Sequence, residues 1–313
     1  KLIEFFKRFP DENSCKSTFK EYREKAGVKC KKCQGLDHYW LKSKELYECK
    51  SCHFRMSLKS GTVMKNSKLP YQYWFIALHL VTVTKKTLSA LEMQRQLGHK
   101  YYEPIWAMMH KMRRSMSKRD DLYHLDSNVE LDEGFYSIAF SLWIDEFTGK
   151  QEELKRGKGS QKKAKVLVMA SFDKVAPEDF NPKKHKTHSK VKYIKMKVVE
   201  DLEATTINGE VESNINTDAS VHTDDYTSYK KLPEIIQKHN AYNLQYDESD
   251  KVLPWVHKAI TNSKNLLKAI HHCVWPDYLQ NYLDEFCYKH NRRYFGTNVF
   301  DRSLIAAVSN TWY

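Results

Sequence analysis

Apolar residues recur at helical spacing in the stretch of chain around residues 61–125. A buried helix is expected at Tyr71–Val83, because an apolar run follows Pro70. A second helix is expected from the cap residue Ser89 to Leu97, closed by Gly98, and a third at Ile105–Met116. Two short helices separated at a glycine are typical of a helix-turn-helix. Residues 61–125 are therefore expected to form a helical domain.

The pattern changes near residue 126. Strands are expected at Val129–Phe140, Val166–Phe172, Val191–Val198 and Ser220–Asp224, and helices at Glu203–Glu212, Tyr226–His239, His257–His271 and Asp277–Arg293. Basic loops are expected at 150–165 and 175–190. Three strands, a helix, a fourth strand and further helices is the order of an RNase-H-like core. The sequence therefore predicts an α/β domain over 126–313, with helices flanking a mixed sheet.

Charge and hydropathy narrow the class of protein. The chain carries 52 Lys and Arg against 39 Asp and Glu, a net charge of +13. Such a surplus favours capture of polyanions, of which nucleic acid is the commonest. No apolar run approaches the roughly 18–20 residues that cross a membrane. We therefore expect a soluble intracellular protein with no membrane partner.

Four of the seven cysteines form two close pairs near the N-terminus. Cys30 and Cys33 make one pair and Cys49 and Cys52 the other, with 15 residues between the pairs. Two knuckles of this spacing bring four thiolates to one tetrahedral zinc ion. We expect structural Zn²⁺, because four cysteines leave no open position for catalysis. Residues 1–60 are thus predicted to form a helical lead and a zinc ribbon, in which His38 and His53 are competing ligand candidates.

Basic residues accompany both N-terminal elements. Those predicted to contact DNA are Lys31, Lys32, Lys50 and Arg55 around the cysteines, and Lys111, Arg113 and Arg114 on the helix at 105–116, where His110 is also expected to be exposed. The alternatives are a zinc site that only stabilises the fold, and a helix whose basic face is merely solvated.

Two acids are placed where strands are expected. Asp132 lies within a strand between apolar neighbours, and Asp224 ends the strand Ser220–Asp224. An acid within a strand costs solvation energy unless it has a partner, and a divalent cation is an efficient one. Two such acids on one sheet can hold a pair of Mg²⁺ ions for phosphoryl transfer. The alternative is that both are ordinary turn or helix-cap residues.

Several motifs together resemble one family. They are Ser57–Val63, Ser67–Pro70 with Trp74, Leu131–Glu133, Gly157–Gly159 with Lys162 and Lys163, Thr223–Asp224, His257–Lys264, Tyr282–Phe286 and Asn291–Arg293. In this order they resemble the zinc-ribbon, ISXO-like group of bacterial insertion-sequence transposases, which is related to the Merlin elements. The resemblance implies a DDE-type DNA transposase with an RNase-H-like core. It implies Mg²⁺- or Mn²⁺-dependent cleavage at transposon ends and joining of the 3′-OH to target DNA.

The resemblance also assigns residues. Asp132 and Asp224 match the family's first two acids, and Asn262, with Lys264 nearby, matches the third position. Asn can coordinate Mg²⁺ but cannot act as a base. The family's glycine after the second acid is Asp225 here, which leaves open which of the two neighbouring acids faces the metal.

Helical periodicity adds a second comparison. It places Asn262 on one flank of its helix and His257 and Lys264 on the other, where DNA phosphate contact is expected. Glu285 is the rival third acid, although its position predicts a solvated or salt-bridged side chain. Arg292 and Arg293 are candidates for phosphate contact or for capping their helix.

Three functions stay open on the sequence. The first is a transposase that acts as a dimer or larger assembly on double-stranded DNA. The second is an RNase-H-like nuclease, or a domesticated derivative, without strand transfer. The third is a non-enzymatic zinc-ribbon regulator, which leaves the two strand-borne acids unexplained.

Overall fold

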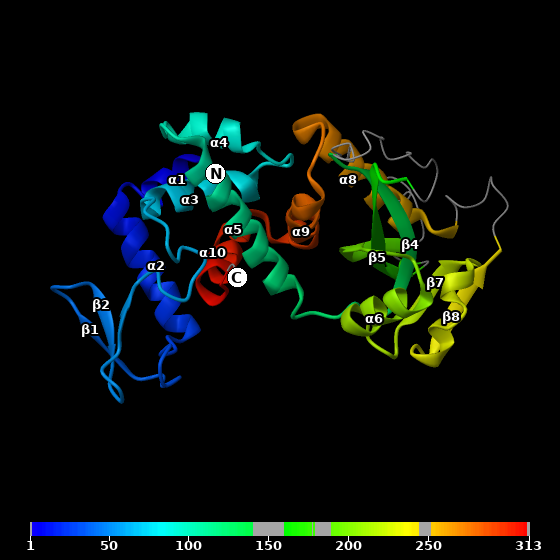
Figure 1. The fold of residues 1–313 in the computed structure, drawn as a ribbon, viewed down its shortest axis with the longest axis horizontal. Helices are drawn as coiled ribbons and strands as arrows, with labels where there is room; N and C mark the ends of the chain where they lie inside the picture. Colours follow the sequence, from blue (N-terminus) through cyan, green and yellow to red (C-terminus); the bar gives the residue numbers. More distant parts are fainter. Residues whose placement is uncertain (1, 140–159, 177, 179–188, 244–251, 312–313) are drawn as a thin grey trace, which may run out of the picture. The chain divides into compact units, whose positions relative to one another are not determined.

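The computed structural model describes residues 2–139, 160–176, 178, 189–243 and 252–311, and it divides into two compact units. Unit 1 comprises residues 1–120 and 292–313, and unit 2 comprises residues 121–291. Both are visible in Figure 1. The sequence grouped 292–313 with the strands, whereas the structure groups this segment with the N-terminal helices. Residues 150–159 of the first expected loop, which include Gly157 and Gly159, lie outside the described residues. So do residues 177 and 179–188 of the second.

Unit 1 is helical apart from one small sheet. Its helices are α1 (Leu2–Arg8), α2 (Glu12–Ala26), α3 (Tyr71–Val83), α4 (Ala90–Leu97), α5 (Tyr102–Asp120), η5 (Arg293–Asn298) and α10 (Val299–Ser309). Its strands β1 (His38–Leu41), β2 (Leu46–Cys49) and β3 (Arg55–Ser57) form an antiparallel sheet. Helix α10 packs against α2, α3 and α5, so the C-terminal segment completes the core of this unit.

The local helix signals of unit 1 act as predicted. The Ser89 hydroxyl accepts the backbone N–H of Glu92 at 3.1 Å, and Gly98 ends α4 in the left-handed region with φ 63°. The prediction of α3 is confirmed to the residue. Helix α5 is longer than predicted, starting at Tyr102 and ending at Asp120.

Unit 2 is built on a mixed sheet. Its strands are β4 (Asn128–Ser137), β5 (Lys163–Lys174), β6 (Ser189–Val199), β7 (Ser220–Asp224) and β8 (Lys238–Tyr242). Among the described residues they lie in the order β6-β5-β4-β7-β8; β4, β5 and β6 are antiparallel, and β4, β7 and β8 are parallel. This order with these directions confirms the RNase-H-like α/β fold.

Helices cover both faces of this sheet. One face packs against α6 (Ala204–Asn214) and the 3-10 turns η3 (Thr227–Tyr229) and η4 (Leu232–Glu234) through a core that includes Val129, Leu131 and Val221. The other face packs against α8 (Pro254–His271) and α9 (Pro276–Asn291) through Val168, Met196 and Leu283 among others. Successive residues of a strand point to opposite faces, so the odd-numbered residues of β4 face α6 and the even-numbered ones face α8.

The predicted helix at Tyr226–His239 is wrong. The structure has η3 and η4 there, followed by β8, which pairs in parallel with β7. Pro233 lacks the backbone N–H that a continuous α-helix would use, and the chain forms only the short turns η3 and η4 here. Strand β8 carries polar, mostly exposed side chains and is held by backbone pairing, so no apolar alternation announces it.

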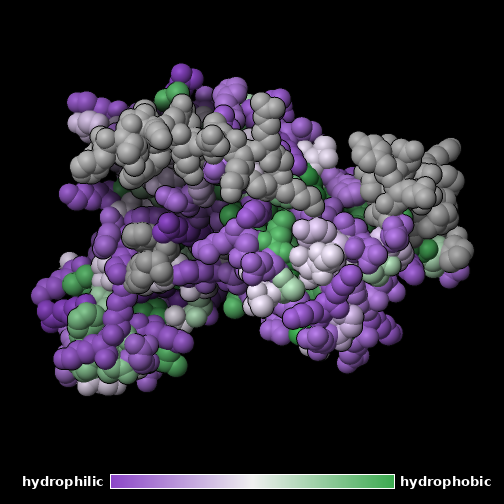
Figure 2. All heavy atoms as spheres, turned by 45° about the vertical axis from the view of Figure 1, so that its right-hand side comes forward, coloured by the Kyte–Doolittle hydropathy of each residue, from purple (hydrophilic) through white to green (hydrophobic). Residues whose placement is uncertain are grey.

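No described helix is both long and apolar enough to span a membrane. On the face seen in Figure 2, hydrophilic side chains dominate and hydrophobic ones form small, separate groups. Together with the net charge of +13, this surface suits a charged ligand better than an apolar one.

Candidate catalytic and DNA-binding sites

The four paired cysteines come together in unit 1. The Sγ atoms of Cys30 and Cys52 lie 3.5 Å apart, as do those of Cys33 and Cys49, and all four lie within 4.8 Å of one another. None is in a disulfide. Zinc–sulfur bonds of about 2.3 Å in a tetrahedron require this spacing, so the sulfur atoms fit one structural zinc ion.

The surroundings of the cluster favour the thiolate form of Cys49. The backbone N–H of Cys52 lowers the pKa of Cys49 to about 6. Neither histidine joins the group: His38 Nδ1 is 2.8 Å from the Leu36 carbonyl, and His53 lies 3.8 Å from Glu48. Among the described residues, these cysteines are the one set of three or more Cys, His, Asp or Glu donors close enough to share an ion.

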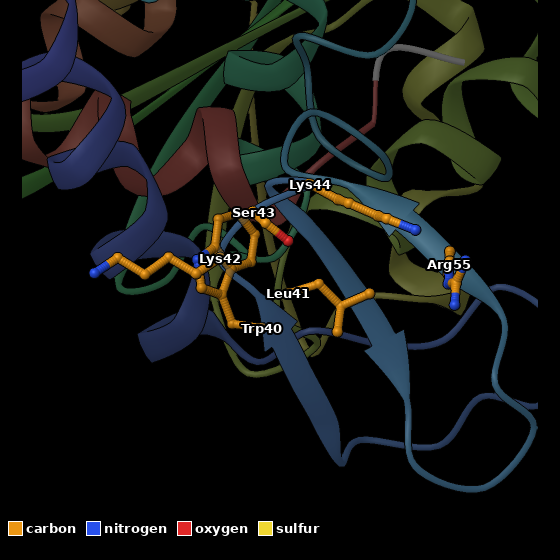
Figure 3. A pocket seen from close by; sticks show the side chains of 6 residues that line it. All are labelled: Trp40, Leu41, Lys42, Ser43, Lys44 and Arg55. Atoms are coloured by element: carbon orange, nitrogen blue, oxygen red, sulfur yellow. The ribbon is translucent and has the colours of Figure 1, made fainter.

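The basic side chains of the ribbon lie on its surface. Lys31, Lys32 and Lys50 are exposed near the knuckles, and Arg55 is exposed but paired with Glu48 at 2.6 Å. At the other end of the β1–β2 hairpin an open hollow of about 690 Å³ is lined by Trp40, Leu41, Lys42, Ser43, Lys44 and Arg55 (Figure 3). Both ends of the hairpin therefore present positive charge to solvent.

The basic face predicted for α5 is mostly buried. His110 is 5% exposed and Arg113 is 2% exposed, while Lys111 donates to the Lys65 carbonyl at 3.0 Å. Arg114 alone of the four is exposed. The expectation that this face is exposed is wrong for His110 and Arg113, because α5 buries residues around most of its circumference, from Ile105 to Met116. The basic surface that α5 exposes to DNA is therefore much smaller than the number of its basic residues suggests.

The even-numbered row of β4 is the surface on which α8 rests. The row consists of Glu130, Asp132, Gly134 and Tyr136, all on the face toward α8. Each residue of the row contacts a position farther along α8. Glu130 contacts Trp255 and Val256, and Asp132 contacts His257. Gly134 lies against Ile260, and Tyr136 contacts Ser263. A Cβ on Gly134 would lie 3.4 Å from Ile260 Cγ1, so the helix approaches the strand closely here. The row therefore fixes α8 along the strand at four levels.

Asp132 is half-buried and has a defined partner. Its Oδ2 atom lies 3.1 Å from Nε2 of His257, and its Oδ1 atom accepts the backbone N–H of Glu133 at 2.7 Å. Sequence reasoning gave His257 to DNA phosphate. In the structure, the His257 ring contacts Asp132, the first catalytic candidate, instead.

Asp224 is the last residue of β7, the strand that pairs in parallel with β4. The parallel pairing runs from Asn128 with Ser220 to Glu130 with His222, and the same register continued by two residues would set Asp132 beside Asp224 on the same face. Adjacent strands are about 4.8 Å apart. Asp225 is exposed and lies beyond the strand. Of the two neighbouring acids, Asp224 is thus the one that the sheet aligns with Asp132.

A buried tyrosine, Tyr229, lies near acidic residues of β4 and β7. Tyr229 is 1% exposed and donates to Glu133 Oε2 at 3.0 Å. Burial raises its pKa well above the usual range, and the charges of Glu133, Asp132 and Asp224 raise it further. Glu133, Asp132 and Asp224 therefore lie near enough to Tyr229 for their charges to act on its hydroxyl.

The two residues assigned to the third position lie on different sides of α8. Lys264 follows His257 by seven residues and lies on the same side of the helix, near enough for Asp132 to raise its pKa, although burial and Lys163 lower it overall. Asn262 is exposed and lies five residues after His257, about 140° around the helix. The structure thus brings His257 and Lys264 toward Asp132, and gives Asn262 the opposite flank.

The remaining candidates, Glu285, Arg292 and Arg293, contact partners within the protein. Glu285, expected to be solvated or salt-bridged, is 2% exposed, and its Oε1 pairs with Lys289 Nζ at 3.9 Å. The salt-bridged alternative is therefore the one the structure shows, because α9 buries side chains on more than one of its faces. Arg292 is 7% exposed and pairs with Asp120 at 2.6 Å. Arg293 donates to the Tyr294 hydroxyl at 2.7 Å. The expectation that Arg292 is available to phosphate is therefore not supported by its place in the fold.

Sequence reasoning missed Glu130. Its carboxylate is 2% exposed and accepts the backbone N–H groups of Trp255 at 2.7 Å and Val256 at 2.9 Å, while burial raises its pKa to about 7. The signal was present, since Glu130 stands two residues before Asp132 between the apolar Val129 and Leu131.

Comparisons with known proteins agree with this description. Residues 124–291 match the model of the ISXO2-like transposase domain, and residues 10–55 match that of the transposase zinc-ribbon domain. The first match covers more than half of the chain and ends at the same residue as unit 2. No curated protein matches the chain.

Some solved structures show a distant likeness. They include a pre-cleavage Mos1 transpososome (8% identity, 77% of this chain and 80% of that chain covered, TM-score 0.28) and the Mos1 mariner paired-end complex with Mn (11%, 78% and 81%, TM-score 0.31). TM-scores this low support no argument about this chain. The family match, with the zinc-ribbon match before it, is sufficient: the chain belongs to the ISXO2-like transposase family and is a DNA transposase.

Proposed function

We propose that this transposase cleaves transposon ends and joins them to target DNA with divalent metal ions held by Asp132 and Asp224. The observation that carries the proposal is the register of β4 and β7: continued two residues beyond the pair of Glu130 and His222, it would set the two acids level and on the same face of the sheet. Carboxylate oxygens are the ligands that Mg²⁺ and Mn²⁺ prefer. Ions bound there would activate a water or a 3′-OH and stabilise the leaving oxygen.

Residues of α8 complete the proposed site. The family resemblance favours Asn262 as the third ligand, whereas its place, about 140° around α8 from His257, does not. The contact at 3.1 Å favours His257 as the group that orients Asp132. Lys264, on the same side of α8 as His257, is suited to contact a DNA phosphate beside the acids. Variants of Asn262 and His257 decide which residue belongs to the metal site.

The proposed DNA-binding surface is the ribbon rather than α5. Lys31, Lys32 and Lys50 are exposed on it, whereas His110 and Arg113 are buried. Since transposition handles two ends together, we propose that the chain acts as a dimer or larger assembly on DNA.

The test is a strand-cleavage and joining assay. Labelled DNA carrying the terminal sequences that flank the coding region is incubated with the protein and Mg²⁺, Mn²⁺ or EDTA. The proposal predicts cleaved and joined products that require a divalent ion. Metal-dependent cleavage without joining would support the nuclease, and binding without cleavage would support the regulator.

A further inference from the structure

We propose that Glu130 is a positioning residue of the catalytic site: its buried carboxylate holds the first turn of α8 and so sets where His257 meets Asp132. This rests on the proposed function, in which Asp132 is a metal ligand. It goes beyond that function by assigning a role to a carboxylate that binds no ion itself.

The first turn of α8 lacks a local cap. Its N-cap residue is Leu253, which has no side chain to accept a hydrogen bond, and Pro254 follows it. The free N–H groups at a helix start need acceptors when they are buried. Glu130 supplies one from another element, since its Oε2 atom accepts from both Trp255 and Val256.

The same turn then delivers His257. The residue after Val256 places its ring nitrogen 3.1 Å from Asp132 Oδ2, and Asp132 is two residues from Glu130 on the same face of β4. Glu130 and Asp132, which follow each other on this face of β4, thus contact successive residues of α8, namely Trp255 and Val256 and then His257. A shift of this turn would move His257 away from Asp132, whereas the contact of Tyr136 with Ser263 at 2.6 Å holds the helix only farther along.

Two substitutions distinguish the hydrogen-bond geometry of Glu130 from its negative charge. Both hydrogen bonds go to one oxygen atom, so Glu130→Gln keeps an acceptor of the same shape without the charge. Glu130→Leu keeps the approximate volume and removes the acceptor. Tyr136→Phe is the matched control, because it removes a contact between the same strand and the same helix at the far level.

The experiment measures two quantities in the full-length protein. Hydrogen exchange followed by mass spectrometry reports on the amides of Trp255 and Val256, and Mn²⁺ titration followed by electron paramagnetic resonance reports on metal affinity. Glu130→Leu should accelerate exchange in this turn and weaken Mn²⁺ binding by about 10- to 100-fold, the usual cost of losing an outer-shell partner. Glu130→Gln and Tyr136→Phe should retain both the parental exchange in this turn and the parental affinity.

Two results would overturn the proposal. One is parental exchange and affinity in Glu130→Leu. The other is an equal loss of affinity in Glu130→Gln, which would mean that the charge matters rather than the acceptor. Asp132→Ala distinguishes a failure of the proposed function: if it binds Mn²⁺ as the parent does, Asp132 is no ligand. Exchange in the Glu130 variants would then still report whether Glu130 holds the turn.

Discussion

His257 and Asp132 are joined by a contact of 3.1 Å between Nε2 and Oδ2, across the boundary between α8 and β4. The histidine ring is thereby aligned with the carboxylate that the family resemblance makes the first catalytic acid. Both side chains are largely buried, at 24% and 17% exposure, so the contact is well sheltered from solvent. We therefore expect His257 to influence the cleavage step rather than DNA affinity.

Replacing His257 by Ala should therefore lower the rate of strand cleavage by about 10- to 100-fold and leave the affinity for end DNA unchanged. Lys258→Ala, next to it and exposed, is the control and should cleave normally. Cleavage rate and DNA affinity are measured separately. If His257 contacts phosphate instead, its loss should weaken binding and reduce the salt dependence by about one counterion.

Cys49→Ser should release zinc and unfold the ribbon, because metal binding supplies the folding energy of such small units. Metal analysis and limited proteolysis of residues 28–60 measure the two effects. Cys273→Ser is the matched control, since Cys273 is exposed and lies outside the cluster. Retention of zinc by Cys49→Ser would contradict the four-cysteine site.

The knuckle lysines should account for part of the salt dependence of DNA binding. Replacing Lys31, Lys32 and Lys50 together by Ala should flatten the plot of log affinity against log salt by about 0.9 for each phosphate that the variant no longer neutralises. Fluorescence anisotropy with labelled end DNA measures the slope. The pair Lys42→Ala and Lys44→Ala serves as the comparison, because it tests the hollow at the other end of the hairpin. An unchanged slope in the triple variant would remove the knuckles from the interface.

His79 should make unit 1 less stable in acid. It is 6% exposed and stacks on Phe5 with ring centroids 4.2 Å apart, and burial lowers its pKa. The unfolded chain then binds a proton that the folded chain excludes. The free energy of unfolding should therefore fall as the pH drops below about 6.5, the value for an unburied histidine.

His79→Phe should remove this part of the pH dependence. Denaturant unfolding of parent and variant at several pH values between 8 and 5 gives the two slopes. Parallel curves would show that His79 does not contribute.

The sequence allowed the elements with strong local signals to be predicted. The spacing of the cysteines, the caps Ser89 and Gly98, and the β-branched and aromatic residues of β4 are each signals carried by nearby residues. Strand β8 could not be found in this way, because its polar side chains carry no pattern and its pairing with β7 is a backbone contact.

Tertiary contacts decided the rest of the site. The charge of Arg113 suggested exposure, but α5 is enclosed by its neighbours and buries it. The link from Glu130 to Trp255 spans 125 residues, and no local rule predicts a cap supplied from that distance. The acids themselves could be named from sequence, whereas their partners required the fold.

The most direct test of the proposed site compares three neighbouring carboxylates in the joining assay. Asp132→Asn and Asp224→Asn should each reduce metal-dependent joined product to background, since each removes a charged ligand while preserving shape. Asp225→Asn, one residue farther and exposed, should join DNA at the parental rate. Loss of joining in Asp225→Asn, with full activity in Asp224→Asn, would contradict the alignment of Asp132 with Asp224 on which the proposed site depends.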